Sequence, residues 1–196
     1  MDMPRDTLST LSDDALMVLY ANGDPAAARA LAGRLLPRVF GQARRMLGDD
    51  GEAEDVAQEA MVRLWRIAPR WRQGEAQVST WLYRVCANLC TDRLRKRRHV
   101  ALDEIAEPED PVPGVERKMQ ERSRDDALQG ALNALPERQR QAVILRHIEG
   151  LANPEIAAVM EISPRAVESL TARGKRALAA LLAGKRAELG YDDDTS

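Results

Sequence analysis

The sequence contains few of the residues on which metal sites and disulfide frameworks depend. Its 196 residues include only two cysteines, Cys86 and Cys90, and two histidines, His99 and His147. A single C-x3-C pair with no histidine at a matching spacing differs from the paired C-x2-C motifs typical of zinc sites. We therefore expect no metal and no cofactor, and we interpret the two thiols as buried, reduced core residues.

Long apolar runs are also absent. No stretch reaches the roughly 18 residues that a membrane-spanning helix needs. The first ten residues, MDMPRDTLST, lack the apolar core of a secretory signal. We expect a soluble, cytoplasmic protein with no membrane insertion.

The third absence is sustained alternation of apolar and polar residues, the pattern of half-buried strands. The chain is instead rich in Ala, Leu, Arg and Glu, with apolar residues at helical spacing. This composition predicts an all-α protein. A chain of this length forms one large domain or two small ones, each with a modest core.

Charge is balanced overall but unevenly distributed. The net charge of −2 disfavours a protein that coats nucleic acid through bulk electrostatics. Residues 49–59 and 103–116 each contain six acids and no bases, whereas residues 84–98 and 165–186 each contain six bases and one acid. Two basic surfaces separated by acidic segments indicate two docking sites.

The helical pattern is interrupted once, over residues 100–124. This segment contains three prolines and many acids, and no helical apolar stripe runs through its first part. We interpret it as a flexible acidic linker. The predicted domains are residues 1–99, a helical bundle, and residues 125–190, with a disordered tail over 191–196.

The stretch from Ser79 to His99 combines an aromatic pair, Trp81 and Tyr83, with a run in which five of six residues are basic. Aromatic rings beside a cationic ridge suit single-stranded nucleic acid, because bases stack on rings while phosphates follow the charge. The alternative is a solvated helix end whose aromatic residues belong to the core. The stretch by itself leaves both interpretations open.

Two capping signals near the C-terminal end indicate a helix-turn-helix. Asn153-Pro154 and Ser163-Pro164 each place a capping residue before a proline, ten residues apart, with a tight turn between two helices. We favour DNA binding over an ordinary antiparallel helix pair with a solvated basic face. Gly174, inside the second helix, should cost about 1 kcal/mol relative to alanine, and the sequence shows no compensation.

Three motifs in order resemble one family. They are AEDVAQEAMVRLWR from Ala53, STWLYRVCANLCTDRLRKRR from Ser79, and LNALPERQRQAVILRHIEGLANPEIAAVMEISPRAVESL from Leu132. Together they resemble the extracytoplasmic-function (ECF, group 4) sigma factors, the small two-domain members of the sigma-70 family of bacterial transcription initiation factors. The resemblance implies a region 2 helical bundle, an acidic linker and a region 4 helix-turn-helix.

The resemblance also implies which residues act. The residues implied to contact the clamp helices of the polymerase's largest subunit are Asp55, Gln58, Glu59, Arg63 and Arg66. Those implied to recognise the −10 element, including a pocket for a flipped base near the loop after Trp71, are Ile67, Trp71, Trp81, Arg84, Val85, Cys86, Asn88, Arg93, Arg95, Lys96, Arg97 and Arg98. Those implied to recognise the −35 element are Arg165, Glu168, Ser169, Ala172, Arg173, Lys175 and Arg176.

The implied partners are core RNA polymerase, including the flap of its second-largest subunit, promoter DNA and an anti-sigma factor. The chain should have no catalytic activity of its own. It departs from the family where Glu168 replaces a commonly basic residue and Ala172 a bulkier one, so the −35 sequence is not predicted. Two other classes share single features with this sequence: a stand-alone helix-turn-helix regulator with an N-terminal sensing domain, and an enzyme or thiol switch built on Cys86 and Cys90.

Overall fold

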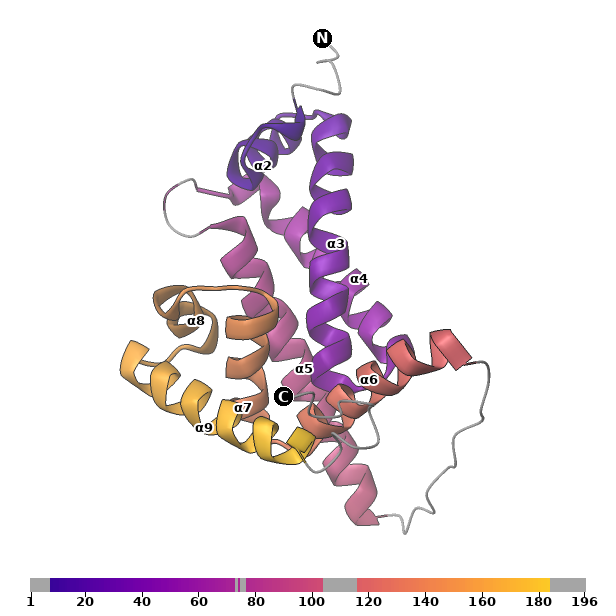
Figure 1. Ribbon diagram of the computed structural model, residues 1–196. Helices are drawn as coiled ribbons and strands as arrows, with labels where there is room; N and C mark the ends of the chain where they lie inside the picture. Colours follow the sequence, from indigo (N-terminus) through magenta and orange to yellow (C-terminus); the bar gives the residue numbers. More distant parts are fainter. Residues whose placement is uncertain (1–7, 73, 75–76, 104–115, 184–196) are drawn as a thin grey trace, which may run out of the picture.

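The computed structural model describes residues 8–72, 74, 77–103 and 116–183, and every regular element in these ranges is helical (Figure 1). The N-terminal unit comprises α2 (Asp13–Ala21), α3 (Pro25–Leu47), α4 (Asp50–Ile67), the 3₁₀ turn η1 (Ala68–Arg70) and α5 (Val78–Asp103). The C-terminal unit comprises α6 (Glu116–Asn133), α7 (Glu137–Val143), the π-helical turn η2 (Ile144–Ile148), α8 (Asn153–Met160) and α9 (Pro164–Ala183). The predicted all-α fold is confirmed. Within the described ranges, no helix has the length and hydropathy that a membrane span requires.

Side-chain caps set the boundaries of the N-terminal helices. Ser12 Oγ accepts a hydrogen bond from the Ala15 amide at 3.2 Å and so caps the start of α2. Helix α3 ends at Gly48, whose φ of 68° is left-handed. Asp49 then accepts from the Glu52 amide at 2.7 Å, so α4 begins at Asp50.

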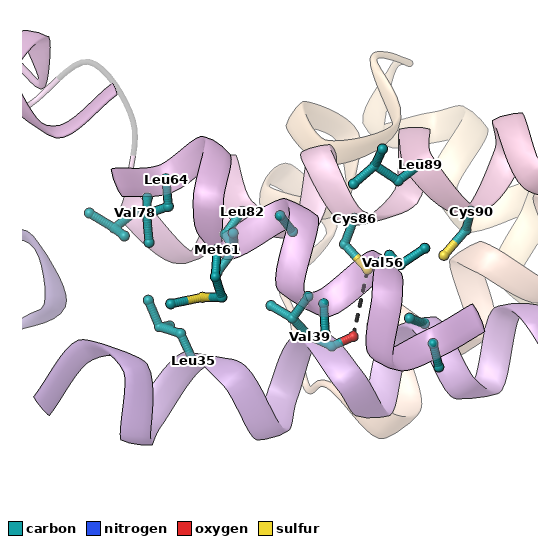
Figure 2. Close-up of a cluster of buried hydrophobic side chains, with 14 of the residues drawn as sticks. Leu35, Val39, Val56, Met61, Leu64, Val78, Leu82, Cys86, Leu89 and Cys90 are labelled. Atoms are coloured by element: carbon teal, nitrogen blue, oxygen red, sulfur yellow. Dashed lines mark hydrogen bonds between the residues drawn. The ribbon is translucent and has the colours of Figure 1, made fainter. Parts of the chain in front are cut away.

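The core of the N-terminal unit lies between α3, α4 and α5 (Figure 2). Most of the apolar residues at helical spacing face inward and are buried, whereas Ile67 and Val85 are half-buried. Burial of each large aliphatic side chain contributes about 1.5–3 kcal/mol relative to exposure. The main contributors are Leu31, Leu35 and Val39 of α3, Val56, Ala60 and Leu64 of α4, and Leu82, Cys86 and Leu89 of α5.

The C-terminal end of α3 is a junction of several helices. The last four carbonyls of a helix have no partner within it, and here each accepts a hydrogen bond. The donors are the Gly48 amide to Arg44 O (2.8 Å), Gln129 Nε2 to Arg45 O (3.1 Å), Arg140 Nη1 to Met46 O (2.6 Å) and Arg97 Nη1 to Leu47 O (2.9 Å). Because three of these donors belong to α6, α7 and α5, this helix end joins the two units.

The two units also share apolar and ionic contacts. Leu132, Leu135 and Ile144 of the C-terminal unit belong to the same hydrophobic cluster as the α3–α5 core. Asp125 of α6 accepts from Arg44 at 2.9 Å and from Arg45 at 2.8 Å. The hydrogen bond from Arg44 lowers the pKa of Asp125, so its carboxylate stays ionised at neutral pH. The predicted domains therefore pack against each other in this structure.

The C-terminal unit contains the predicted helix-turn-helix, with one corrected cap. Ser163 Oγ accepts from the Ala166 amide at 3.2 Å, so Ser163 caps α9 as expected. At α8, however, the capping position is Ala152 and not Asn153, and the Glu155 carboxylate accepts from the Ala152 amide at 2.7 Å. The turn between the helices contains Glu161 in a left-handed conformation, with φ at 53°.

Gly174 is explained by close packing between α7 and α9. A Cβ at this position would lie 2.6 Å from Val143 Cγ2 and 3.1 Å from the Gln139 carbonyl oxygen. Only glycine permits this approach. The cost of placing glycine inside a helix is therefore offset by the close contact of α9 with α7, which the sequence alone did not reveal.

The predicted linker is shorter in the structure than in the sequence interpretation. Helix α5 continues to Asp103, and α6 begins at Glu116. The residues at the start of α6, ERKMQER, are mostly strong helix formers, which explains a helix there without an evident apolar stripe. The rest of the acidic segment, residues 104–115, and the predicted tail lie outside the described residues.

Replacing Gly174 with alanine should destabilise the protein, although the same change in an open helix stabilises it. We expect Gly174→Ala to lower the free energy of unfolding by about 1–3 kcal/mol, because the added methyl group overpacks α7 against α9. Urea unfolding followed by circular dichroism measures this. The matched control is Gly33→Ala in α3, where nothing lies within 4 Å of an added Cβ; it should raise stability by up to about 1 kcal/mol. Equal effects of the two changes would contradict the proposed packing constraint.

Candidate nucleic-acid and protein interface

The outward side of α4 presents the five residues predicted to bind polymerase. Asp55, Gln58, Arg63 and Arg66 are exposed and Glu59 is half-buried. Their spacing places them on one side of the helix. Glu59 and Arg63 form an i,i+4 ion pair at 2.6 Å, which is worth only a few tenths of a kcal/mol at an exposed site.

Val62 is a member of this surface that the sequence prediction omitted. Its side chain is 44% exposed, although it is a large apolar residue. It lies seven residues after Asp55 and three after Glu59, on the same side of α4. The sequence spacing already places Val62 on the outward side of α4, away from the buried residues. An exposed apolar residue among charged ones indicates a contact surface.

Two tryptophans meet where η1 leads towards α5. The ring centroids of Trp71 and Trp81 are 6.3 Å apart, with an interplanar angle of 85°. Both rings are half-buried, as are Ile67 and Val85, which are also predicted to line the base pocket. The structure thus brings the two tryptophans together, with Ile67 four residues before Trp71 and Val85 four residues after Trp81 in the sequence. Residues 73, 75 and 76 of the predicted pocket loop lie outside the described residues.

Asn88 and Cys86 lie on different sides of α5. Asn88 is exposed, whereas Cys86 is fully buried and its Sγ lies 3.6 Å from the Val39 carbonyl oxygen (Figure 2). Its position in the core corrects the expectation that Cys86 forms a wall of an open pocket. Hydrogen bonding with Cys90 and burial raise the pKa of the Cys86 thiol, so it stays protonated and a poor nucleophile. Both cysteines are free thiols in the core, as predicted.

The basic run at the end of α5 is not a uniform cationic ridge. Arg97 donates a hydrogen bond to the Glu52 carboxylate at 3.0 Å and another to the Leu47 carbonyl at the end of α3. Arg93 lies 3.6 Å from the Asp55 carboxylate. Arg98 pairs with Glu137 of the C-terminal unit at 2.8 Å. Arg95 and Lys96 are exposed, and Arg95 has only a long contact of 3.9 Å with Asp92.

Arg84, one turn before Asn88, also faces the C-terminal unit. Its Nη1 lies 3.5 Å from Glu161 Oε1. The sequence had indicated the basic residues but not their partners. Those partners are distant along the chain, so local periodicity carries no signal for them.

Helix α9 exposes all seven residues predicted to contact the −35 element. Val167 and Gly174 are buried on the opposite side and attach the helix to the rest of the unit. Glu168 is the only acid in α9 and lies near its N-terminal end. In a helix-turn-helix, the N-terminal residues of the second helix contact base edges and basic residues contact phosphates.

Two family models match the chain. Residues 31–100 match "Sigma-70 region 2" and residues 125–178 match "Sigma-70, region 4". These segments include, respectively, α4 with most of α5, and the helix-turn-helix.

Similar proteins cover most of the chain. The ECF RNA polymerase sigma factor SigE of Mycolicibacterium smegmatis is 33% identical over 87% of this chain and 68% of its own length. SigM of Mycobacterium tuberculosis is 33% identical over 87% of this chain and 85% of its own length. The RNA polymerase sigma-H factor of Pseudomonas aeruginosa is 30% identical over 87% of this chain and 94% of its own length.

Among solved structures, CnrH in complex with the cytosolic domain of CnrY superposes with a TM-score of 0.66, at 27% identity, and covers 88% of this chain and 97% of its own. The sigma factor RpoE of Bartonella quintana has the same fold, with a TM-score of 0.62 at 22% identity over 78% of this chain and 94% of its own. The sequence matches, the two family models and the shared fold agree. The chain belongs to the ECF RNA polymerase sigma factors of the sigma-70 family.

Proposed function

We propose that this protein binds core RNA polymerase, directs it to promoters with specific −10 and −35 elements, and melts the −10 region. The observation that carries the proposal is the arrangement of α4 and α5, which pack together while exposing different surfaces. Helix α4 exposes charged residues with Val62 among them, and α5 exposes Asn88 and Lys96. One chain can then touch polymerase and promoter at once.

The −10 surface would favour the melted promoter by capturing an unstacked base. The paired rings of Trp71 and Trp81 provide an aromatic platform, and Val85 and Asn88 follow about one and two turns after Trp81 on α5. Binding a flipped base there would offset the few kcal/mol that unstacking and unpairing cost. No nucleotide hydrolysis is needed, so the chain would need no catalytic activity of its own.

The −35 surface would be the exposed side of α9. Arg173, Lys175 and Arg176 are placed to hold phosphates, and Arg165, Glu168 and Ser169 lie where base edges are recognised. Glutamate accepts hydrogen bonds from cytosine N4. The predicted contact of this unit with the polymerase flap also belongs to this proposal.

We further propose that an anti-sigma factor controls the chain in the cytoplasm. The similar protein CnrH was solved in complex with the cytosolic domain of CnrY. A regulator of this kind could cover the surfaces of α4 and α9, both of which are exposed here.

Run-off transcription with bacterial core polymerase on a genomic promoter library tests the function. The protein should produce start sites at a small set of promoters that core polymerase alone does not use. Start sites identical to those of core alone would refute the proposal. Tight promoter binding without polymerase would instead support a stand-alone regulator.

Charge reversal on α4 should separate polymerase binding from folding. We expect Asp55→Lys with Glu59→Lys to abolish retention of core polymerase in a pull-down, because both side chains lie on the proposed docking surface. The circular dichroism spectrum and unfolding midpoint should change little, since exposed ion pairs contribute about 0–1 kcal/mol. Asp126→Lys, at an exposed position of α6, is the control and should retain core polymerase. Undiminished retention by the double variant would contradict the assignment.

Neighbouring basic residues on α5 should differ in role. Lys96→Ala should weaken promoter binding by the holoenzyme at all sequences and reduce the salt dependence by about one phosphate contact. Arg97→Ala should lower the free energy of unfolding by about 1 kcal/mol or more, because it leaves the Leu47 carbonyl and Glu52 without their donor. Salt titration of fluorescence anisotropy and urea unfolding measure the two effects. Matching changes in both assays would show that the two residues are equivalent.

A further inference from the structure

The first amide of α5 finds its acceptor on another helix. Val78 N–H donates to Asp14 Oδ1 of α2 at 3.1 Å, across 64 residues of sequence. Helices α2, α3, α4 and α9 differ, because each is capped by the residue immediately before it. At α5 that residue is Gln77, whose carbonyl accepts from the Trp81 amide at 3.0 Å. Glutamine is not among the residues that cap helices well, so Asp14 supplies from a distance what a local side chain supplies elsewhere.

The helix that carries this carboxylate is fixed to α3. Arg34 of α3 pairs with Asp13 at 3.1 Å and donates hydrogen bonds to three carbonyls just before α2. Those carbonyls belong to Leu8 (2.9 Å), Ser9 (2.6 Å) and Leu11 (2.6 Å). A series of polar contacts therefore runs from α3 through the start of α2 to the start of α5.

Helix α2 contacts both of the elements that carry the aromatic pair, η1 as well as α5 (Figure 1). Trp71 directly follows η1, and its amide donates to the Ala68 carbonyl at 3.0 Å. Trp81 lies three residues after Val78, in the first turn of α5. The 6.3 Å separation and 85° angle of the two rings therefore depend on two elements that α2 holds in place.

Asp14 also has a simpler role to be weighed. Asp13 and Asp14 lie in the first turn of α2, where negative charge stabilises a helix through its dipole. That role needs a charge but no hydrogen bond to another element. The two roles differ for asparagine, which keeps an oxygen acceptor for the Val78 amide and loses the charge.

We propose that Asp14 is a positioning residue for promoter melting. It fixes the first turn of α5 and, through that turn, the ring of Trp81 against Trp71, so that the platform for an unstacked base is formed before the base arrives. A preformed surface loses less binding free energy to ordering. Asp14 acts on melting and not on initial binding, because duplex DNA presents no unstacked base. This proposal rests on the −10 role proposed for the two tryptophans.

Hydrogen exchange on the full free chain tests the anchoring without DNA. In Asp14→Ala, the first-turn amides of α5 should exchange about fivefold faster, the effect of removing a typical cap. Asp14→Asn should stay close to the wild type. The matched control is Asp24→Ala, which removes a carboxylate that caps α3 through the Ala26 amide at 2.8 Å; it should leave exchange in α5 unchanged. Wild-type exchange in Asp14→Ala, measured by mass spectrometry, would overturn the anchoring.

Permanganate footprinting of the holoenzyme tests the role in melting. Core polymerase is saturated with each variant and mixed with a promoter found by the run-off experiment. With Asp14→Ala, reactive thymines should appear several-fold more slowly, while closed-complex affinity, measured by anisotropy at low temperature, stays unchanged. Asp14→Asn should restore the wild-type rate. Asp24→Ala should melt the promoter at the wild-type rate, although it too removes a helix cap. Equal melting rates for the two alanine variants would overturn the positioning role.

The remaining outcomes separate this proposal from the proposed function. If Asp14→Asn melts the promoter as slowly as Asp14→Ala, the charge acts and the hydrogen bond does not, which overturns the positioning role alone. If the wild type melts no promoter while the exchange result stands, the proposed function fails. Asp14 then anchors α5 without a role in melting.

Discussion

The carbonyl groups at the end of α3 impose the constraint on which the rest of the structure depends. The Gly48 amide closes the last helical bond of α3, and the next three carbonyls need donors from outside the helix, which they receive from Gln129, Arg140 and Arg97. A buried carbonyl without a donor costs about 1–3 kcal/mol, more than a satisfied one contributes. The arrangement is therefore cooperative, because removing any donor leaves an unsatisfied group at the junction of α5, α6 and α7. The two arginines also place positive charge at the negative end of the helix dipole.

This junction explains why α5 has little surface left for a partner. One side packs on α3 and α4, a second packs on the C-terminal unit, and Arg97 is committed to α3 and α4. What stays exposed is Asn88, Asp92, Arg95 and Lys96, together with residues 98–100 near the end of the helix. The function proposed for the chain therefore depends on how its two units are arranged as well as on which residues it contains.

The sequence predicted features that depend on neighbours along the chain. The start of α9, for example, follows from Ser163. Features that depend on distant residues were missed. The partner of Arg97 is Leu47, fifty residues away, and the neighbour that requires glycine at 174 is on α7. Cys86 was misplaced for a related reason, because helical spacing shows which residues lie together but not how deeply the helix is buried.

The attachment of α9 has a consequence for how promoter preference could change over evolution. The buried side of the helix is held in place by Val167 and by the close approach of Gly174 to α7. The residues on the outward side make few contacts within the protein. Substitutions on the outward side therefore leave the orientation of the helix unchanged. Duplicated copies of such a gene could diverge in the DNA sequences they select without losing stability. Glu168 and Ala172 are exposed residues on this outward side, where such substitutions are tolerated.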